Sequence, residues 1–277
     1  PAADVPASAL ADAPAALPAT PTPEATLGPT SEPTGPPPGT NPLTGLPVRE
    51  ALLVHPPLLV TVSNETEAVR PWSGLSMADH VWEAQIEGLA RTSLTAVFLS
   101  HAPTRVGAVR GAHLIDLDEL VPMYHGVLVT AGGSTNGGAG GPPRIVELLA
   151  AAPWAERVIS PERGFAEPYL TRIADFPTAG VSFWNTVFAD AAAVWRWARG
   201  EGFTAKDAPA GLAFAAEAPR GGKITRTVLV DYPQFGPKRE WVYDEARGRW
   251  LSSTDDVPDS DTLAEGQLAF DNVVILF

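Results

Sequence analysis

The chain lacks cysteine altogether and carries little positive charge. Without Cys among its 277 residues, it has no disulfide bonds, no thiolate catalysis and no cysteine-ligated metal site. Lysine and arginine number 19 against 32 aspartates and glutamates, which gives a formal net charge of −13. Because phosphate neutralisation needs clustered Lys and Arg, we expect no nucleic-acid partner and no attraction to anionic lipid.

Several other functional signals are also missing. No apolar run approaches the roughly 18 residues that a membrane-spanning helix needs. His101, His113 and His125 have no metal-ligand spacing, so we expect no metal and no cofactor. The sequence contains no G-x-S-x-G nucleophile elbow and no phosphate-binding loop with its Lys-Ser/Thr pair. These absences exclude the commonest hydrolase and nucleotide-binding signatures.

The first forty residues differ in composition from the rest. Residues 1–40 are mainly Ala, Pro, Thr, Ser and Glu, and nearly half of the 29 prolines precede Val48. Such a segment buries too little apolar surface to offset its ordering entropy, so we predict a disordered linker. The chain starts without Met inside this segment, and we expect a targeting or anchoring segment upstream of it.

Beyond the linker, apolar runs alternate with helix signals. Strands are predicted at residues 58–62, 92–100 and 125–130, and helices at 77–84, 114–120, 144–152 and 189–199. The alternation predicts an α/β domain over residues 41–200, with a mixed sheet flanked by helices.

The C-terminal part has a different pattern. Strand-like runs occur at 212–214, 224–230, 240–243, 249–252 and 272–277, with a hairpin turn at 245–248. We therefore predict a smaller β-rich domain over residues 201–277. Because the chain ends inside an apolar run, we expect a further segment after Phe277.

Polar residues recur at the ends of the apolar segments, more often than packing requires. Ligand sites of α/β sheets lie at the carboxyl ends of strands. We therefore predict that these side chains line or support a polar cleft that binds a ligand: Asn64, Arg70, Glu83, Glu87, Arg110, His113 and Ser134.

The spacing of Glu83 and Glu87 puts both carboxylates on one face if a single helix carries them. Two interpretations stay open, a solvated helix edge and a carboxylate pair that faces a cleft opposite Arg70 and Arg110. A facing pair would suit acid–base cleavage of a glycosidic bond. The arginines would otherwise neutralise the acids in a structural network.

Two further features have a structural interpretation. The glycine-rich segment 131–141 lies between a strand and a helix, where backbone N–H groups can bind anions, but a flexible connector is the favoured interpretation. Ser134 is the exception within it. Trp184, Trp195 and Trp197 are interpreted as core residues in preference to a sugar-stacking platform.

The motifs of the chain resemble one family. N-P-L-T-G-L-P (41–47), R-P-W-S-G-L-S-M-A-D-H-V-W-E (70–83), V-G-A-V-R-G-A-H (106–113) and A-G-G-S (131–134) resemble the YerB-like bacterial lipoproteins, the DUF3048 domain family of unknown function. Residues 241–250 and 268–277 resemble that family's β-rich end. The chain departs from the pattern at His113, where the family pattern has Arg, and at Ser63, where it has an acid. The resemblance implies an extracytoplasmic, lipid-anchored protein.

These observations favour a binding or scaffolding role at the cell envelope. Mixed charges suit a zwitterionic or carboxylate ligand, such as a peptide or a peptidoglycan fragment, held by arginine. One alternative is a hydrolase of envelope polymer in which Glu83 and Glu87 act as acid and as base or nucleophile. Another is a purely structural adaptor. We expect contact with the membrane only through a lipid anchor upstream of this chain.

Overall fold

The computed structural model describes residues 38–65, 67–87, 91–135, 144–205, 212–215, 221–233 and 236–276. Three predictions fall wholly or partly outside these residues. They concern the linker up to residue 37, the glycines beyond residue 135 and the terminal Phe277.

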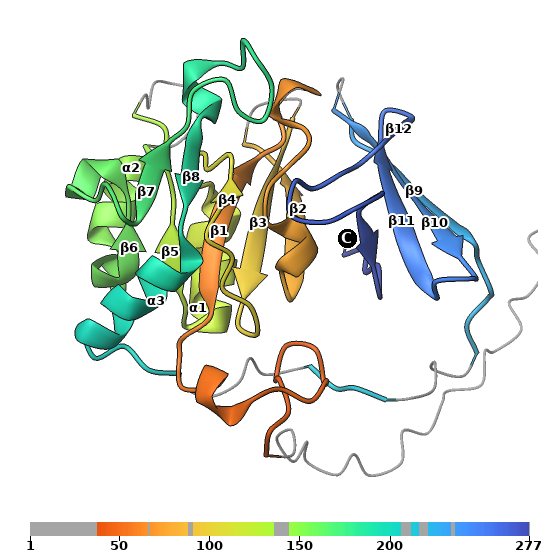
Figure 1. Ribbon diagram of the computed structural model, residues 1–277, viewed down its shortest axis with the longest axis horizontal. Helices are drawn as coiled ribbons and strands as arrows, with labels where there is room; N and C mark the ends of the chain where they lie inside the picture. Colours follow the sequence, from red (N-terminus) through yellow and green to blue (C-terminus); the bar gives the residue numbers. More distant parts are fainter. Residues whose placement is uncertain are drawn as a thin grey trace, which may run out of the picture. The chain divides into compact units, whose positions relative to one another are not determined.

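A mixed five-stranded sheet lies at the centre of the α/β part (Figure 1). Its strands, in spatial order, are β2 (His80–Gln85), β3 (Thr92–Phe98), β1 (Leu58–Ser63), β5 (Val127–Val129) and β6 (Val158–Ile159). β1 pairs antiparallel with β3 and parallel with β5, and β5 pairs parallel with β6. This arrangement confirms the predicted mixed sheet.

The two faces of this sheet pack into separate hydrophobic cores. Along β1, Leu58 and Val60 face one core and Leu59 faces the other, as the two-residue period of a strand requires. The first core also contains α3 (Ala191–Gly200) and a small sheet of β4 (Val106–Gly107), β8 (Val187–Ala189) and β7 (Leu170–Arg172). The second is covered by a π-helical turn (Asp116–Leu120), α1 (Val121–Tyr124) and α2 (Ile145–Ala151). Burial on both faces explains the continuous apolar runs of β1 and β5.

Short 3-10 turns connect these elements. They are η1 (Glu50–Leu52), η2 (Glu67–Val69), η3 (Leu75–Met77), η5 (Ala155–Arg157), η6 (Pro161–Arg163) and η7 (Phe183–Asn185).

The C-terminal part forms a separate antiparallel sheet, which confirms its predicted β-rich character. The strand order is β12 (Val257–Pro258), β11 (Arg249–Thr254), β10 (Lys238–Asp244) and β9 (Thr227–Asp231), and β13 (Ala269–Phe270) also pairs with β11. The predicted hairpin turn joins β10 to β11, where Gly248 adopts a φ of 63° and donates to the carbonyl of Asp244 at 2.8 Å. A left-handed φ favours Gly there.

Four local predictions are wrong. The helix expected at 77–84 is instead strand β2, because its residues pair with β3 from His80 to Gln85 and only η3 precedes it. Residues 212–214 and 272–276 form no strand. Trp195 lies in the core, but Trp184 is largely exposed, in the loop between β7 and β8.

Two neighbouring leucines of α2 test how that helix packs. Leu149 is 6% exposed in the second core, whereas Leu148 is 43% exposed. We predict that Leu149→Ala lowers the free energy of unfolding by about 2–5 kcal/mol, because it removes buried methyl groups and leaves a cavity. Leu148→Ala should change it by less than about 0.5 kcal/mol. Urea unfolding of both variants checks this, and equal losses would contradict the orientation of α2.

Candidate functional site

The polar residues predicted from the sequence fall into two groups with different surroundings. We call the first the buried network: Asn64, Arg70, Glu83, Thr92, Arg239, Ser252, Thr254 and Asp259. We call the second the carboxyl-edge group: Glu65, Glu87, Arg110, His113 and Ser134. The predicted residues are therefore divided between two sites.

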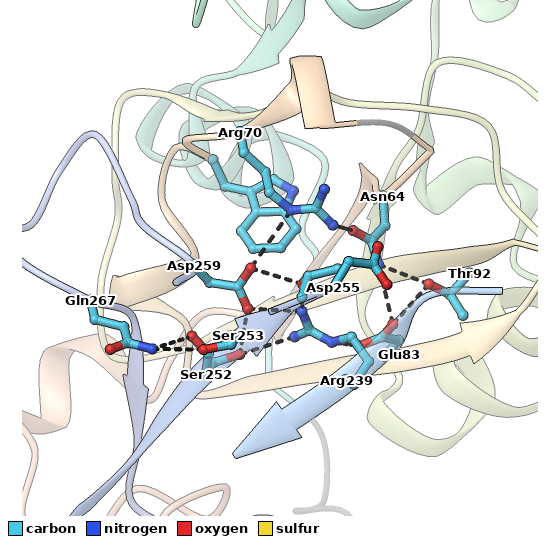
Figure 2. A network of polar contacts seen from close by, with 12 residues as sticks. Asn64, Arg70, Glu83, Thr92, Arg239, Ser252, Ser253, Asp255, Asp259 and Gln267 are labelled. Carbon is cyan, nitrogen blue, oxygen red and sulfur yellow. Dashed lines mark hydrogen bonds and ion pairs between the residues drawn. The ribbon is translucent and has the colours of Figure 1, made fainter. Parts of the chain in front are cut away.

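Glu83 is the carboxylate that the α/β part contributes to the buried network. It lies on β2, and its carboxylate accepts hydrogen bonds from Asn64 at 3.1 Å and from Thr92 Oγ1 at 2.8 Å. Its other oxygen lies 2.8 Å from Nε of Arg239, which comes from β10 in the C-terminal sheet. Figure 2 shows Glu83 with these partners around it. The side chains of Glu83 and Arg239 are only 9% and 4% exposed.

Asp259 completes the network from the segment after β12. Its carboxylate lies 2.8 Å from Nη1 of Arg239 and accepts from Ser252 at 2.6 Å and Thr254 at 2.8 Å. Nε of Arg70 lies 3.6 Å from the same carboxylate (Figure 2). Burial lowers the pKa of Arg239, but the charges of Glu83 and Asp259 outweigh it and raise the pKa overall.

Trp72 lies beneath the two arginines of the network. Its ring centroid is 4.7 Å from the guanidinium carbon of Arg70 and 6.0 Å from that of Arg239. Its backbone N–H donates to Ser260 at 3.0 Å and its carbonyl accepts from Thr262 at 2.8 Å. The network therefore joins the C-terminal sheet to the α/β part through buried charge pairs. Its carboxylates are engaged by protein partners, which is the arrangement of a structural brace.

The Glu83–Glu87 pair does not have the predicted geometry. Because β2 is a strand, the helix that would align the two carboxylates does not exist. Glu83 faces Arg239, whereas Glu87 lies beyond the end of β2, where it contacts His113 and the N–H of Leu114. The described contacts place the two acids in separate groups, so the helical basis for a paired acid–base site is lost.

The carboxyl-edge group lies where the parallel strands end. Glu65 follows β1, residues 131–134 follow β5, and Glu162 follows β6 within η6. The segment 110–113 runs beside the segment after β5, since Ala131 N–H donates to the carbonyl of Arg110 at 2.9 Å. Gly132 has a φ of 98°, and a Cβ there would collide with the carboxylate of Glu162. This edge is where open α/β sheets bind ligands.

Arg110 is the most exposed cation among the predicted site residues. Its Nη2 lies 2.6 Å from the carboxylate of Glu65, and the two side chains are 27% and 24% exposed. Nε of Arg110 is buried and has no hydrogen-bond partner among the described residues. Its backbone is fixed, because its carbonyl accepts from Thr61 at 2.5 Å and Thr130 at 3.0 Å.

His113 is held between two acids. Its Nδ1 lies 3.0 Å from the Glu87 carboxylate, and its backbone N–H donates to Asp116 at 2.8 Å. Burial alone would raise the pKa of Glu87, but hydrogen bonds from His113 and Leu114 outweigh it and lower the pKa. Burial raises the pKa of Asp116, which also accepts from Thr95 on β3 at 2.5 Å.

Ser134 lies at the start of α2, apart from the charged pairs. Its Oγ accepts from Ile145 N–H at 3.4 Å and its carbonyl accepts from Val146 N–H at 3.3 Å. The described contacts thus connect Ser134 to the helix that follows the glycine-rich segment.

Sequence reasoning missed several members of both groups. Glu65 lies in none of the motifs that resemble the family, and the same is true of Asp116, which contacts His113 from outside the group. Arg239 had a signal, since in K-R-E-W-V-Y-D it alternates with Trp241 and so shares a strand face with an aromatic residue. Asp259 follows the short edge strand β12 and had no such signal.

The segment 41–43 is fixed by Asp79 and His80. Asp79 accepts from the side chain of Asn41 at 2.7 Å and from the N–H of Leu99 at 2.6 Å. Nε2 of His80 lies 2.7 Å from the carbonyl of Leu43, and Nδ1 lies 2.6 Å from the hydroxyl of Tyr124. Burial lowers the pKa of His80, although its hydrogen bond to Leu43 opposes this shift. The motif residues Asn41, Asp79 and His80 therefore stabilise the fold.

We predict that loss of Arg239 strongly destabilises the protein. Arg239→Ala should lower the free energy of unfolding by about 3–5 kcal/mol, because it leaves the carboxylates of Glu83 and Asp259 buried without their cation. The matched control is Arg226→Ala, which breaks an exposed pair with Glu245 and should cost less than about 1 kcal/mol. Denaturant unfolding compares them, and similar losses would refute a bracing role.

His80 should make stability depend on pH. Because folding lowers its pKa, the unfolded chain binds the proton more readily. The contribution of His80 is complete above pH 6.5 and is lost as pH falls below that value. We predict that His80→Gln flattens the decline in unfolding free energy between about pH 7 and 5.5. An unaltered slope in His80→Gln would contradict this.

Comparison with known proteins supports the resemblance of the motifs. Residues 43–140 match the family model described as "Protein of unknown function (DUF3048) N-terminal domain". A curated relative, "Putative lipoprotein YerB" of Bacillus subtilis (strain 168), is 46% identical over 71 residues, which are 26% of this chain and 21% of that protein. The match thus spans about a fifth of the relative's length.

The similarity in three dimensions is more extensive. A crystal structure of the YerB protein from Bacillus subtilis superposes with a TM-score of 0.65 and 27% identity, over 83% of this chain and 71% of that one. In the described part of the chain, no helix is long and apolar enough to cross a membrane. The chain therefore contains, over residues 43–140, a domain of the DUF3048 family, and it is YerB-like in structure beyond that domain.

Proposed function

We propose that the protein is an extracytoplasmic lipoprotein that binds a small carboxylate-bearing envelope ligand, a peptide or a peptidoglycan fragment, at the carboxyl-edge group. The observation that carries the proposal is Arg110, a partly exposed guanidinium held where the parallel strands end. Binding is favoured over hydrolysis, because Glu83 is engaged by Arg239 and is not free to act with Glu87.

The surroundings of Arg110 support a carboxylate as its ligand. A guanidinium binds a carboxylate through two parallel N–H donors. Glu65 engages Nη2, and Nη1 of Arg110 has no hydrogen bond to the described residues. The backbone around Arg110 is fixed by Thr61 and Thr130, so its position need not be organised by the ligand.

The acids of the same edge support a ligand that also carries a positive charge. Glu65 and Glu87 are both partly exposed. They would complement an ammonium group, as in a zwitterionic peptide whose carboxylate binds Arg110. His113 lies against Glu87 and would border the ligand on that side.

The cellular location rests on different support. The relative YerB bears the name of a lipoprotein, and residues 1–40 have the Pro/Thr/Ala-rich composition of a tether. We propose that a lipid anchor upstream of this chain holds the folded part outside the cytoplasmic membrane.

A matched pair of dipeptides tests the proposal. We expect D-alanyl-D-alanine to raise the melting temperature of the full chain, whereas the same peptide with an amidated C-terminus does not. Isothermal titration should show that Arg110→Ala weakens binding of the free acid by roughly 10- to 100-fold, because a charged hydrogen bond contributes about 1.5–3 kcal/mol. Arg226→Ala, at an exposed pair, serves as the control and should bind like the wild type.

Three results would count against this function. They are binding of neither peptide by the wild type, equal binding of the amide and the acid, and full affinity in Arg110→Ala. The melting temperature of each variant without ligand shows whether a loss of binding comes from unfolding.

A further inference from the structure

Two exposed aromatic side chains lie together in the loop between β7 and β8. Phe183 and Trp184 are 60% and 65% exposed, unlike Trp195, which lies in the core. Their ring centroids are 5.7 Å apart and the ring planes are inclined by 79°. Residues of this size are seldom left in water without a role when they form a cluster.

The pair is held in place by Arg172. Its Nη1 donates to the carbonyl of Phe183 at 2.5 Å and to Thr186 Oγ1 at 2.7 Å. The guanidinium carbon lies 3.7 Å from the centre of the Phe183 ring. Ser182 and Asn185 close the turn, since Asn185 N–H donates to the carbonyl of Ser182 at 2.7 Å. A surface fixed in this way loses little entropy when it binds a ligand.

The loop borders the carboxyl end of β1 but uses residues outside the carboxyl-edge group. Thr178 Oγ1 donates to the carbonyl of Ala68, in η2, at 3.2 Å, and Val109 N–H donates to the carbonyl of Val187 at 2.7 Å. In Figure 1 the segment joining β7 to β8 lies at the upper end of the view. Through Thr178, the loop that carries the aromatic pair thus contacts η2, the turn that follows β1.

We propose that Phe183, Trp184 and Arg172 form a second binding site, which takes the sugar ring of an acidic glycan. The indole face of Trp184 would stack on the C–H face of a sugar ring, and Phe183 would flank it. Nε and Nη2 of Arg172 have no hydrogen bond to the described residues, so they can bind a carboxylate of the same sugar.

The charge of the molecule favours a glycan over a lipid surface. Binding to an anionic membrane needs several clustered Lys or Arg residues around the inserted aromatics. The chain carries only 19 Lys and Arg against 32 Asp and Glu, and Arg172 is the cation that contacts the Phe183 ring. A single arginine beside two rings instead fits one carboxylate on one sugar.

Titration of the full chain with two disaccharides tests this site. We expect N-acetylglucosaminyl-N-acetylmuramic acid to shift the indole signal of Trp184 in NMR spectra, and N,N′-diacetylchitobiose, which lacks the carboxylate, to bind about tenfold more weakly. Trp184→Ala should weaken binding of the acidic sugar about tenfold, whereas Trp184→Phe keeps a ring and loses less. Arg172→Gln should reduce the affinity for the acidic sugar to that for N,N′-diacetylchitobiose.

Controls separate this site from its neighbours and from general surface effects. Phe214→Ala removes another exposed aromatic ring and should bind as the wild type does. Arg110→Ala should also retain sugar binding, and a loss there would overturn the claim of a separate site.

The proposal is also overturned if the wild type binds neither sugar, or if Trp184→Ala retains full affinity. Vesicles of anionic phospholipid complete the test. Binding of vesicles that disappears in Trp184→Ala, without sugar binding, would assign the rings to the membrane instead.

Discussion

The buried guanidinium of Arg239, between the carboxylates of Glu83 and Asp259, is the interaction on which the rest of the arrangement depends. Removing three charged groups from water carries a large desolvation cost, which is offset only by close pairing and further hydrogen bonds. Ser252, Thr254, Asn64 and Thr92 supply those bonds. Because Glu83 comes from the central sheet and Arg239 from the C-terminal one, neither sheet can satisfy these charges alone.

The buried network is connected to the carboxyl-edge group through residues that are neighbours in the sequence or lie on the same strand. Asn64 donates to Glu83 in the network, and the next residue, Glu65, pairs with Arg110. On β3, Thr92 donates to Glu83, and Thr95 donates to Asp116, which in turn accepts from the N–H of His113. The buried network therefore positions the backbone from which the exposed charges project. Rigid support of this kind is what a binding site needs from the residues behind it.

Much of the fold was predictable, and the failures have physical causes. Strands β1, β3 and β5 are apolar and buried on both faces, so their sequences alone indicate them. β2 was mistaken for a helix because its identity depends on pairing with β3 and on contacts of His80 and Trp82 with Tyr124, far along the chain. The exposure of Trp184 likewise depends on the fold around it, since its residue type favours the core.

The candidate site was only partly predictable, for a related reason. Their position at the ends of apolar segments selected Asn64, Arg70, Glu83 and Arg110 together, but it cannot distinguish a residue that holds the fold from one that meets a ligand. The partners decide that, and Arg239 and Asp259 lie in a part of the sequence where no motif drew attention to them. The sequence therefore identifies the polar residues, but it does not separate those that stabilise the fold from those that can contact a ligand.

The exposed fraction of each side chain and its ion-pair partners distinguish the two groups. Glu83 is 9% exposed and is bound to a cation that is itself buried, so a ligand that reached it would first have to break the brace. Arg110 is 27% exposed, is paired on one side only among the described residues, and stands on a fixed backbone. A ligand can bind there without dismantling the protein, because the charges that stabilise the fold are elsewhere. Every buried charge needs a partner. In the buried network the partners are protein side chains, so a ligand cannot bind there. The carboxyl-edge group remains accessible to a ligand at the edge of the sheet.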